Sequence, residues 1–273
     1  MAVRGEGLIA VPDDVAEALA LAGPRAGRLG HRVSWYSDIP STNDEALALA
    51  ERGAEEGWLV GADSQSAGRG RHGRIWASPP GGGLYVSVVL RPPAQAVRLL
   101  TLAAGVAVAE GIQAASGAEA GVKWPNDVCL PLSRPRKVAG ILAEANATGT
   151  QVDYVVVGVG VNVGHAALPP DVADRATSIE AELGRPVPRG TIAAEVCAAL
   201  WHRYQQLVAG DDDAVLAAWR ARGVATFGRV VEWDSGGETA RGVARDVDRT
   251  GALVVDTAQG VACVASGELR WLT

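Results

Sequence analysis

The fold is decided by two stretches, KVAGILAEA at 137–145 and VDYVVVGVGVNV at 152–163. Both are nearly continuous apolar runs, the pattern of strands that are buried on both faces in the middle of a sheet. Before them, Leu84–Leu90 alternates like a strand, and Gln95–Ala115 repeats apolar residues at helical spacing over about five turns. We therefore expect an α/β (α+β) domain with a mixed central sheet and a buried central helix.

Shorter elements complete this domain in the sequence. Strands are predicted at 32–36, 58–63, 121–124 and 128–130, and helices at 12–22, 177–183, 189–208 and 211–222, with Gly23-Pro24 ending the first helix. From about Phe227 the sequence changes to short β runs separated by glycine turns, which predicts a small closed barrel. We place the domain boundary near Gly223, with residues 1–223 in the α/β domain and 224–273 in the barrel.

Composition excludes several classes of protein. Of the 273 residues, 48% are hydrophobic and 21% charged, which is typical of a folded globular chain. The net charge of −6 argues against a general nucleic-acid binder, so any anion site must be local. The three widely spaced cysteines offer neither a disulfide framework nor a CxxC metal site, and they fit a reducing cytoplasm. No export signal or membrane span is expected.

Lysine is used sparingly. Only Lys123 and Lys137 among the 25 basic residues are lysines; the others are arginines. A lysine kept against this bias is expected to do something that a guanidinium cannot, although random retention is the alternative. Lys137 also opens the apolar strand, where a partly desolvated cation can meet an anion.

A glycine-rich loop carries several arginines. The stretch GRGRHGR at 68–74 matches GxGxxG, but the IWASPPG that follows cannot begin a helix, so a dinucleotide-binding motif is not expected. The P-loop pattern also fails. The loop is then either a solvated basic segment or a clamp that folds over an anionic ligand. The turn KWPND at 123–127 is by itself a weak signal.

Together the motifs resemble biotin–protein ligases. The resemblance rests on segments in the family's order: STN at 41–43, Q-x-x-GRGRxGRxW at 65–76, KWPND at 123–127, KxAGILxE at 137–144, GxGxN at 158–162, and the C-terminal barrel. It implies an SH3-like form for that barrel. Some family members carry an N-terminal winged helix-turn-helix, and the residues before Val33 are too few for one, so we expect the ligase-only type without DNA binding.

The resemblance implies a two-step reaction in which biotin and MgATP form biotinyl-5′-AMP, and a carrier-protein lysine then attacks this adenylate. By similarity, the catalytic residues are Lys137, Arg71 and Asp127. The biotin-binding residues are Ser41, Thr42, Asn43, Gln65, Arg69, Gly70, Arg71, Trp76, Lys137 and Gly140. The ATP-binding residues are Arg69, His72, Arg74, Lys123, Trp124, Asn126, Lys137 and Asn162. Asp127 matches a position tied either to Mg²⁺ or to orienting the lysine.

The expected cosubstrate is the complex of ATP and Mg²⁺, with biotin as substrate and no tightly bound metal. The expected partner is the biotin carboxyl carrier domain of a carboxylase, without DNA or membrane, for a cytoplasmic monomer or weak homodimer. Two alternatives stay open. A lipoate–protein ligase would share the fold and the adenylation chemistry, and a nucleic-acid-binding protein would use the arginine loop and the barrel.

Overall fold

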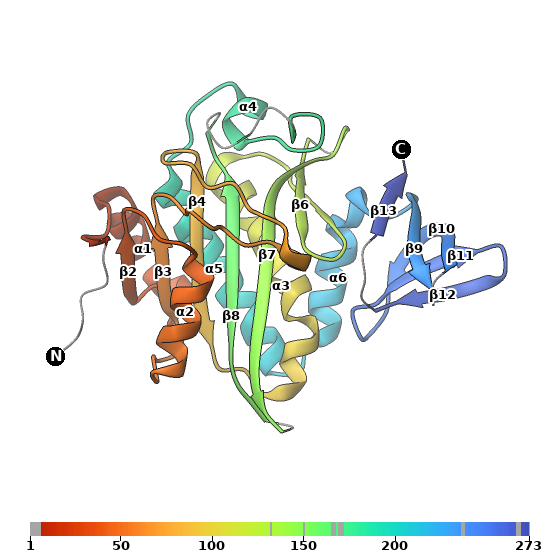
Figure 1. The fold of residues 1–273 in the computed structure, drawn as a ribbon, viewed down its shortest axis with the longest axis horizontal. Helices are drawn as coiled ribbons and strands as arrows, with labels where there is room; N and C mark the ends of the chain where they lie inside the picture. Colours follow the sequence, from red (N-terminus) through yellow and green to blue (C-terminus); the bar gives the residue numbers. More distant parts are fainter. Residues whose placement is uncertain are drawn as a thin grey trace.

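The computed structural model describes residues 7–131, 133–149, 151–164, 168, 172–235, 238–265 and 269–272. In this part of the chain the larger sheet is mixed and eight-stranded, in the order β1-β2-β3-β4-β8-β7-β6-β5 (Figure 1). Its strands are β1 (Leu8–Ile9), β2 (Arg32–Tyr36), β3 (Trp58–Ala62), β4 (Gly83–Leu90), β5 (Gly121–Lys123), β6 (Asp127–Leu130), β7 (Arg136–Thr148) and β8 (Gln151–Asn162). The mixed α/β fold expected from the apolar runs is confirmed.

Helices cover both faces of this sheet. One face packs against a helical layer made of α1 (Asp13–Ala26), α3 (Ala94–Ser116), α5 (Arg189–Val208) and α6 (Asp212–Arg222). The other face carries α2 (Thr42–Glu51), while the short α4 (Ile179–Leu183) follows the segment after β8. Helix α3 is long and apolar enough to cross a membrane, but most of it is buried among the other helices, as expected of a central core helix.

The alternation along β8 assigns its two faces. Val155, Val157, Val159 and Val161 belong to the main core beneath the helical layer. Tyr154 and Val156 belong to a second core, under α2. Since side chains alternate along a strand, Gly158, Gly160 and Asn162 share the α2 face. The prediction that this strand is buried on both faces is confirmed.

The C-terminal part forms a separate antiparallel sheet at one end of the molecule, beside α6 (Figure 1). It has the order β12-β11-β10-β9-β13. Its strands are β9 (Val230–Ser235), β10 (Glu238–Val247), β11 (Leu253–Thr257), β12 (Gly260–Val264) and β13 (Leu269–Leu272). Arg220 of α6 donates to Asp246 of β10 at 2.6 Å, which ties the sheet to the larger part.

The predicted end of the first helix is wrong. Helix α1 continues through Pro24 to Ala26 and has Gly27 at its C-terminal cap. The buried face explains this, because Val15, Leu19, Ala22 and Ala26 follow helical spacing across the proline. Packing of this face against α5 outweighs the hydrogen bond that proline removes.

Candidate functional site

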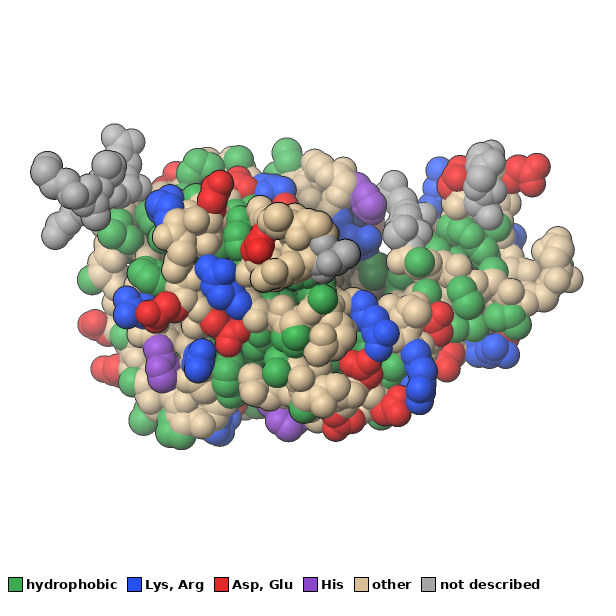
Figure 2. Space-filling model, turned by 90° about the horizontal axis from the view of Figure 1, so that it is seen from below, with side chains coloured by type: hydrophobic (Ala, Val, Ile, Leu, Met, Phe, Trp, Pro, Cys, Tyr) green, Lys and Arg blue, Asp and Glu red, His purple; other side chains and the backbone are tan. Residues whose placement is uncertain are grey.

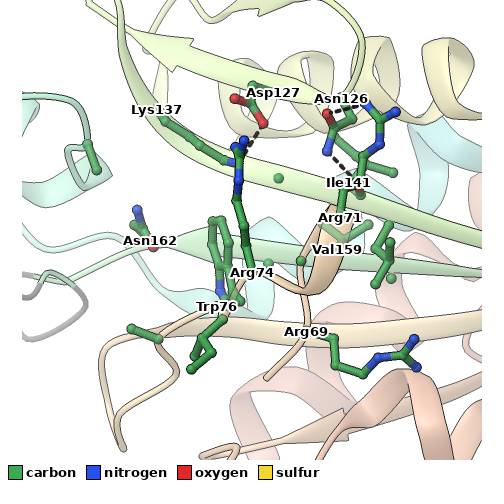
Figure 3. A pocket seen from close by; sticks show the side chains of 18 of the residues that line it. Arg69, Arg71, Arg74, Trp76, Asn126, Asp127, Lys137, Ile141, Val159 and Asn162 are labelled. Atoms are coloured by element: carbon green, nitrogen blue, oxygen red, sulfur yellow. Dashed lines mark hydrogen bonds and ion pairs between the residues drawn. The ribbon is translucent and has the colours of Figure 1, made fainter. Parts of the chain in front are cut away.

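A pocket of about 820 Å³ lies on the α2 face of the larger sheet. The structure brings together all the residues that the sequence predicted for the site. These are Ser41, Thr42, Asn43, Gln65, Arg69, Gly70, Arg71, His72, Arg74, Trp76, Lys123, Trp124, Asn126, Asp127, Lys137, Gly140 and Asn162. They come from five segments that are far apart in the chain, and Figure 3 shows several of them around the cavity.

Glycines on the central strands leave room for an aromatic side chain on the sheet. A Cβ at Gly160 would lie 2.5 Å from Cε2 of Trp76, and one at Gly140 would lie 3.0 Å from Cζ3 of the same ring. The indole therefore rests on both glycines. Ala139 and Ala143 face the other side of the sheet, where they pack with the core beneath the helical layer.

A bulge in β7 directs Lys137 into the pocket. The pairing with β6 runs from Val128↔Ala139 to Cys129↔Lys137, so Val138 is an extra residue on β7. Val138 and Ala139 are both fully buried in the main core, and the strand then turns Lys137 to the opposite face. A regular alternation would have put Lys137 on the same face as Ala139 and Ile141. The bulge thus turns the Lys137 side chain toward the pocket, where it is a cation of the site.

The ammonium of Lys137 has defined neighbours. Its Nζ lies 2.6 Å from Oδ1 of Asp127 and 5.1 Å from the ring centroid of Trp76, within cation–π range (Figure 3). The backbone of Lys137 is held from the other side, since its N–H donates to the carbonyl of Arg175 and its carbonyl accepts from the N–H of Thr177, both at 2.9 Å. The cation is therefore held at a fixed place on a rigid strand.

One end of the pocket is rich in hydrogen-bond acceptors. Ser41 caps α2 by accepting from the N–H of Asp44. Oε1 of Gln65 accepts from the Thr42 N–H at 2.8 Å and lies 3.1 Å from the Thr42 hydroxyl. The buried Ser87 hydroxyl lies 2.9 Å from the Thr42 hydroxyl and 2.6 Å from Oδ1 of Asn43. These three oxygen–oxygen contacts share only two hydrogens, those of the Thr42 and Ser87 hydroxyls. One acceptor oxygen is therefore left without a donor from the protein.

Asn43 itself is largely committed to the protein. Its Nδ2 donates to Oε2 of Glu144 at 2.8 Å and to the carbonyl of Leu142 at 3.3 Å. A Cβ at Gly158 would lie 2.0 Å from Oδ1 of Asn43, so the amide is packed directly on the strand. With both amide hydrogens used, Asn43 offers a ligand only a lone pair of Oδ1.

The arginine loop folds back on itself at the pocket wall. Gly70 donates its N–H to the carbonyl of Arg74 at 2.7 Å, and Trp76 donates to Gly68 at 2.8 Å, around the short 3₁₀ turn Arg71–Gly73. Arg71 donates to Oδ1 of Asn126 at 3.2 Å. Burial lowers the pKa of the Arg71 guanidinium, the nearby Asp127 partly opposes this, and Arg74 adds to it.

Arg69 lies differently from the other two arginines. Its guanidinium points away from Lys137 and forms ion pairs with Asp44 and with Glu144, the latter at 2.6 Å (Figure 3). Two carboxylates therefore balance the charge of Arg69.

The other end of the pocket includes the C-terminal sheet. Trp271 and Leu269 of β13 line the wall, and Nζ of Lys123 lies 5.0 Å from the ring centroid of Trp271. Burial lowers the pKa of Lys123. The buried Trp124 donates from its indole to the carbonyl of Gly251 at 2.9 Å, so this residue also joins the two sheets.

Sequence reasoning missed several residues that line the pocket or lie directly behind its wall. Ser87 had a usable signal, because it is a lone polar residue in the apolar run LYVSVVL. Glu144 is the last residue of the KxAGILxE motif, but the motif by itself indicates no role for it. Trp271 and Arg175 had no local signal, since only the folded chain brings them to the pocket.

Asp127 is the acidic residue that lines this pocket in the described part of the chain. Over those same residues, no group of three or more His, Cys, Asp and Glu side chains is placed to hold a metal ion. Mg²⁺ commonly binds through one or two carboxylates together with substrate phosphates and water. The donor set therefore fits a magnesium ion that arrives with a nucleotide.

Comparison with known proteins decides the family. Residues 35–162 match the Biotin/lipoate A/B protein ligase family. The chain is 34% identical over 277 residues to the bifunctional ligase/repressor BirA of Bacillus spizizenii, covering 98% of this chain and 83% of that protein. It is 39% identical over 252 residues to the biotin–acetyl-CoA-carboxylase ligase of Mycobacterium tuberculosis, covering 89% of this chain and 90% of that protein.

The chain belongs to the biotin protein ligase family. The resemblance seen in its motifs is thereby confirmed. Among solved structures of this family, the Aquifex aeolicus biotin protein ligase in complex with biotin and ATP superposes with a TM-score of 0.75 at 25% identity. That similarity covers 89% of this chain and 99% of the Aquifex chain.

Proposed function

We propose that this biotin protein ligase joins biotin to a carrier-protein lysine through biotinyl-5′-AMP. The observation that carries the proposal is the arrangement of one pocket, which joins an acceptor-rich end at Thr42 to a cation, Lys137, on the central sheet. The Aquifex relative with similar fold was solved with biotin and ATP, and this supports the assignment of both ligands.

The acceptor-rich end suits the ureido ring of biotin. A ureido group carries two N–H donors and one carbonyl acceptor. Its N–H groups match the Thr42 hydroxyl oxygen and Oδ1 of Asn43, which both lie on the pocket wall, and the Ser41 hydroxyl is available to donate to its carbonyl. A dithiolane ring, as in lipoate, has no such donors and would leave these buried groups unpaired. The end therefore favours biotin over lipoate.

Lys137 suits the first chemical step. An oxygen of the biotin carboxylate attacks the α-phosphorus of ATP, the bond to the β-phosphate oxygen breaks, and pyrophosphate leaves. Both reacting groups are anionic, so positive charge must be supplied where they meet. The compact ammonium of Lys137 fits between two oxygens, and the ion pair with Asp127 holds it in place.

In the second step the uncharged amine of the carrier lysine attacks the acyl carbon, AMP leaves, and the amine proton is released. Arg71 and Arg74, on a loop that folds back on itself, are placed to cover the adenylate and keep water from the mixed anhydride. Arg69 and Gly70 belong to the same wall. We assign His72, Lys123, Trp124, Asn126 and Asn162 to the nucleotide end of the pocket.

We assign Mg²⁺ to the nucleotide, with Asp127 as its protein ligand. When bound, the ion offsets the charge of the phosphates. The donor set described above supports this, because a single carboxylate suits a metal that is held mainly by phosphate oxygens.

We further propose that residues 224–273 form an SH3-like barrel and a domain of their own, packed so that Trp271 completes the nucleotide end.

The partner is the biotin carrier domain of a carboxylase, which the name of the Mycobacterium relative supports. The free cysteines fit a cytoplasmic location. That the chain is a monomer or a weak dimer stays a prediction. On the face that Figure 2 shows, Lys and Arg side chains are interspersed with Asp and Glu, which speaks against a nucleic-acid surface there.

Biotin-dependent exchange of labelled pyrophosphate into ATP tests the proposal. We expect exchange with biotin, none without it, and none with lipoate. Exchange that depends on lipoate and not on biotin would assign the lipoate reaction instead. Binding to nucleic acid that falls steeply with salt, without any exchange, would favour the nucleic-acid alternative.

A further inference from the structure

Glu144 is the last residue of the KxAGILxE motif and has no role in the reaction as described above. It lies on β7, on the same face as Gly140 and Leu142. Its two carboxylate oxygens serve different partners. Oε2 accepts from Nδ2 of Asn43 at 2.8 Å, and Oε1 accepts from the guanidinium of Arg69 at 2.6 Å.

These two partners belong to different walls of the pocket. Asn43 lies in the first turn of α2, and its Oδ1 accepts from the Ser87 hydroxyl that also contacts Thr42. Arg69 lies at the start of the arginine loop, where it forms an isolated bridge with Ile75. One carboxylate on the rigid sheet thus holds both the acceptor-rich end and the loop.

Only a carboxylate of this length meets both demands. A glutamine has the same shape but one acceptor oxygen, so it must lose either the Asn43 amide or the Arg69 guanidinium. An aspartate is one methylene shorter. Asp44 also pairs with Arg69, whereas the two hydrogens of the Asn43 amide go to Glu144 and to the carbonyl of Leu142. Glu144 is therefore the group that links the two walls.

We propose that Glu144 is a positioning residue, which sets the affinity for the ureido ring by holding the side chains of Asn43 and Arg69 in fixed positions relative to each other. This inference rests on the proposed function. Asn43 is 4% exposed and packs on Gly158, so its amide cannot find a new partner in water, and its orientation fixes the hydroxyl of Ser87. Because Arg69 points away from Lys137, losing one of its two carboxylate partners should weaken binding more than it slows the chemistry.

The test compares Glu144→Gln with Glu45→Gln. Glu45 is a matched control, because it is 27% exposed against 24% for Glu144 and likewise pairs with an arginine, Arg52, at 3.2 Å. Biotin affinity is measured by calorimetry, and KM and kcat by biotin-dependent pyrophosphate exchange. For Glu144→Gln we expect biotin affinity to fall and KM to rise about tenfold, with kcat within about threefold. For Glu45→Gln we expect changes below twofold.

Two further measurements separate positioning from general destabilisation. Trypsin should cut after Arg69 faster in Glu144→Gln than in the wild type or in Glu45→Gln, at similar melting temperatures. In a double-mutant cycle, the losses of Glu144→Gln and Arg69→Gln should be less than additive. Unchanged biotin affinity in a folded Glu144→Gln, or fully additive losses, would overturn the inference. If the wild type binds no biotin, the proposed function fails instead, while the trypsin comparison without ligand still reports on the Glu144–Arg69 link.

Discussion

Replacing Lys137 by arginine keeps the charge of the site and changes its shape. In the structure, Nζ lies 2.6 Å from Asp127 and 5.1 Å from the centre of the Trp76 ring. It also lies close above Gly140, where an added Cβ would be 3.1 Å from Nζ. A guanidinium is planar and wider, and it prefers two parallel hydrogen bonds to one carboxylate. We expect the arginine to turn toward Asp127 and leave the place where the two anions meet.

The expected magnitudes differ for rate and stability. Loss of correctly placed charge should slow adenylation at least ~100-fold, which corresponds to about 2.7 kcal/mol of transition-state stabilisation. The Lys137–Asp127 pair is 31% and 28% exposed, so its change should alter the free energy of unfolding by less than about 1 kcal/mol. A large loss of rate with a small loss of stability is the signature of a catalytic role.

The assay is pyrophosphate exchange at saturating biotin, with urea unfolding as the control for folding. Arg136→Lys is the matched variant, because Arg136 is the preceding residue on β7, pairs with Glu182 at 2.5 Å and does not line the pocket. It should keep adenylation within about twofold. Near-normal adenylation by a folded Lys137→Arg protein would show that Lys137 does not act on the reacting groups.

Four further predictions concern ligand choice, packing and the cysteines. Lipoic acid should bind at least ~100-fold more weakly than biotin in calorimetry, because buried acceptors go unpaired; equal affinities would refute this. Gly160→Ala places a Cβ 2.5 Å from Trp76 and should cost about 1–3 kcal/mol in urea unfolding, whereas an unchanged midpoint would contradict the packing. Burial raises the pKa of Cys129 and Cys197 to about 12, so at pH 8 only Cys263 should react with a thiol reagent. Since the folded thiols keep their protons, the free energy of unfolding should fall as pH rises from about 9 toward 12.

The central fold could be predicted because its signals are local. A continuous apolar run or a helical repeat reports burial directly, and the strand at 152–163 and the helix at 95–115 were therefore found close to their observed bounds, Gln151–Asn162 and Ala94–Ser116. The end of α1 could not be predicted in this way. Pro24 is a strong local stop signal, and only the packing of α1 on α5 overrides it.

Membership of the site could be predicted better than the contacts within it. The motifs contain the right residues, but the bulge at Val138 that turns Lys137 into the pocket has no mark in the sequence, since it depends on pairing with β6. The ion pairs of Arg69 could not be predicted from the sequence either. Pairing between segments 25 and 75 residues apart is decided by the fold as a whole.

The α2 face of β8 serves two purposes along its length. Near its beginning, Tyr154 and Val156 pack under α2 as core, and from Gly158 onward the same face becomes the floor of the pocket. The opposite face, with Val157, Val159 and Val161, stays in the main core throughout. The floor beneath Lys137 is therefore held in place from two directions. The main core packs on the opposite face of β8, and the core under α2 packs on the same face nearer the beginning of the strand. Ligand-dependent change should accordingly be confined to the arginine loop and the wall from β13, because these parts of the pocket are not held between two cores.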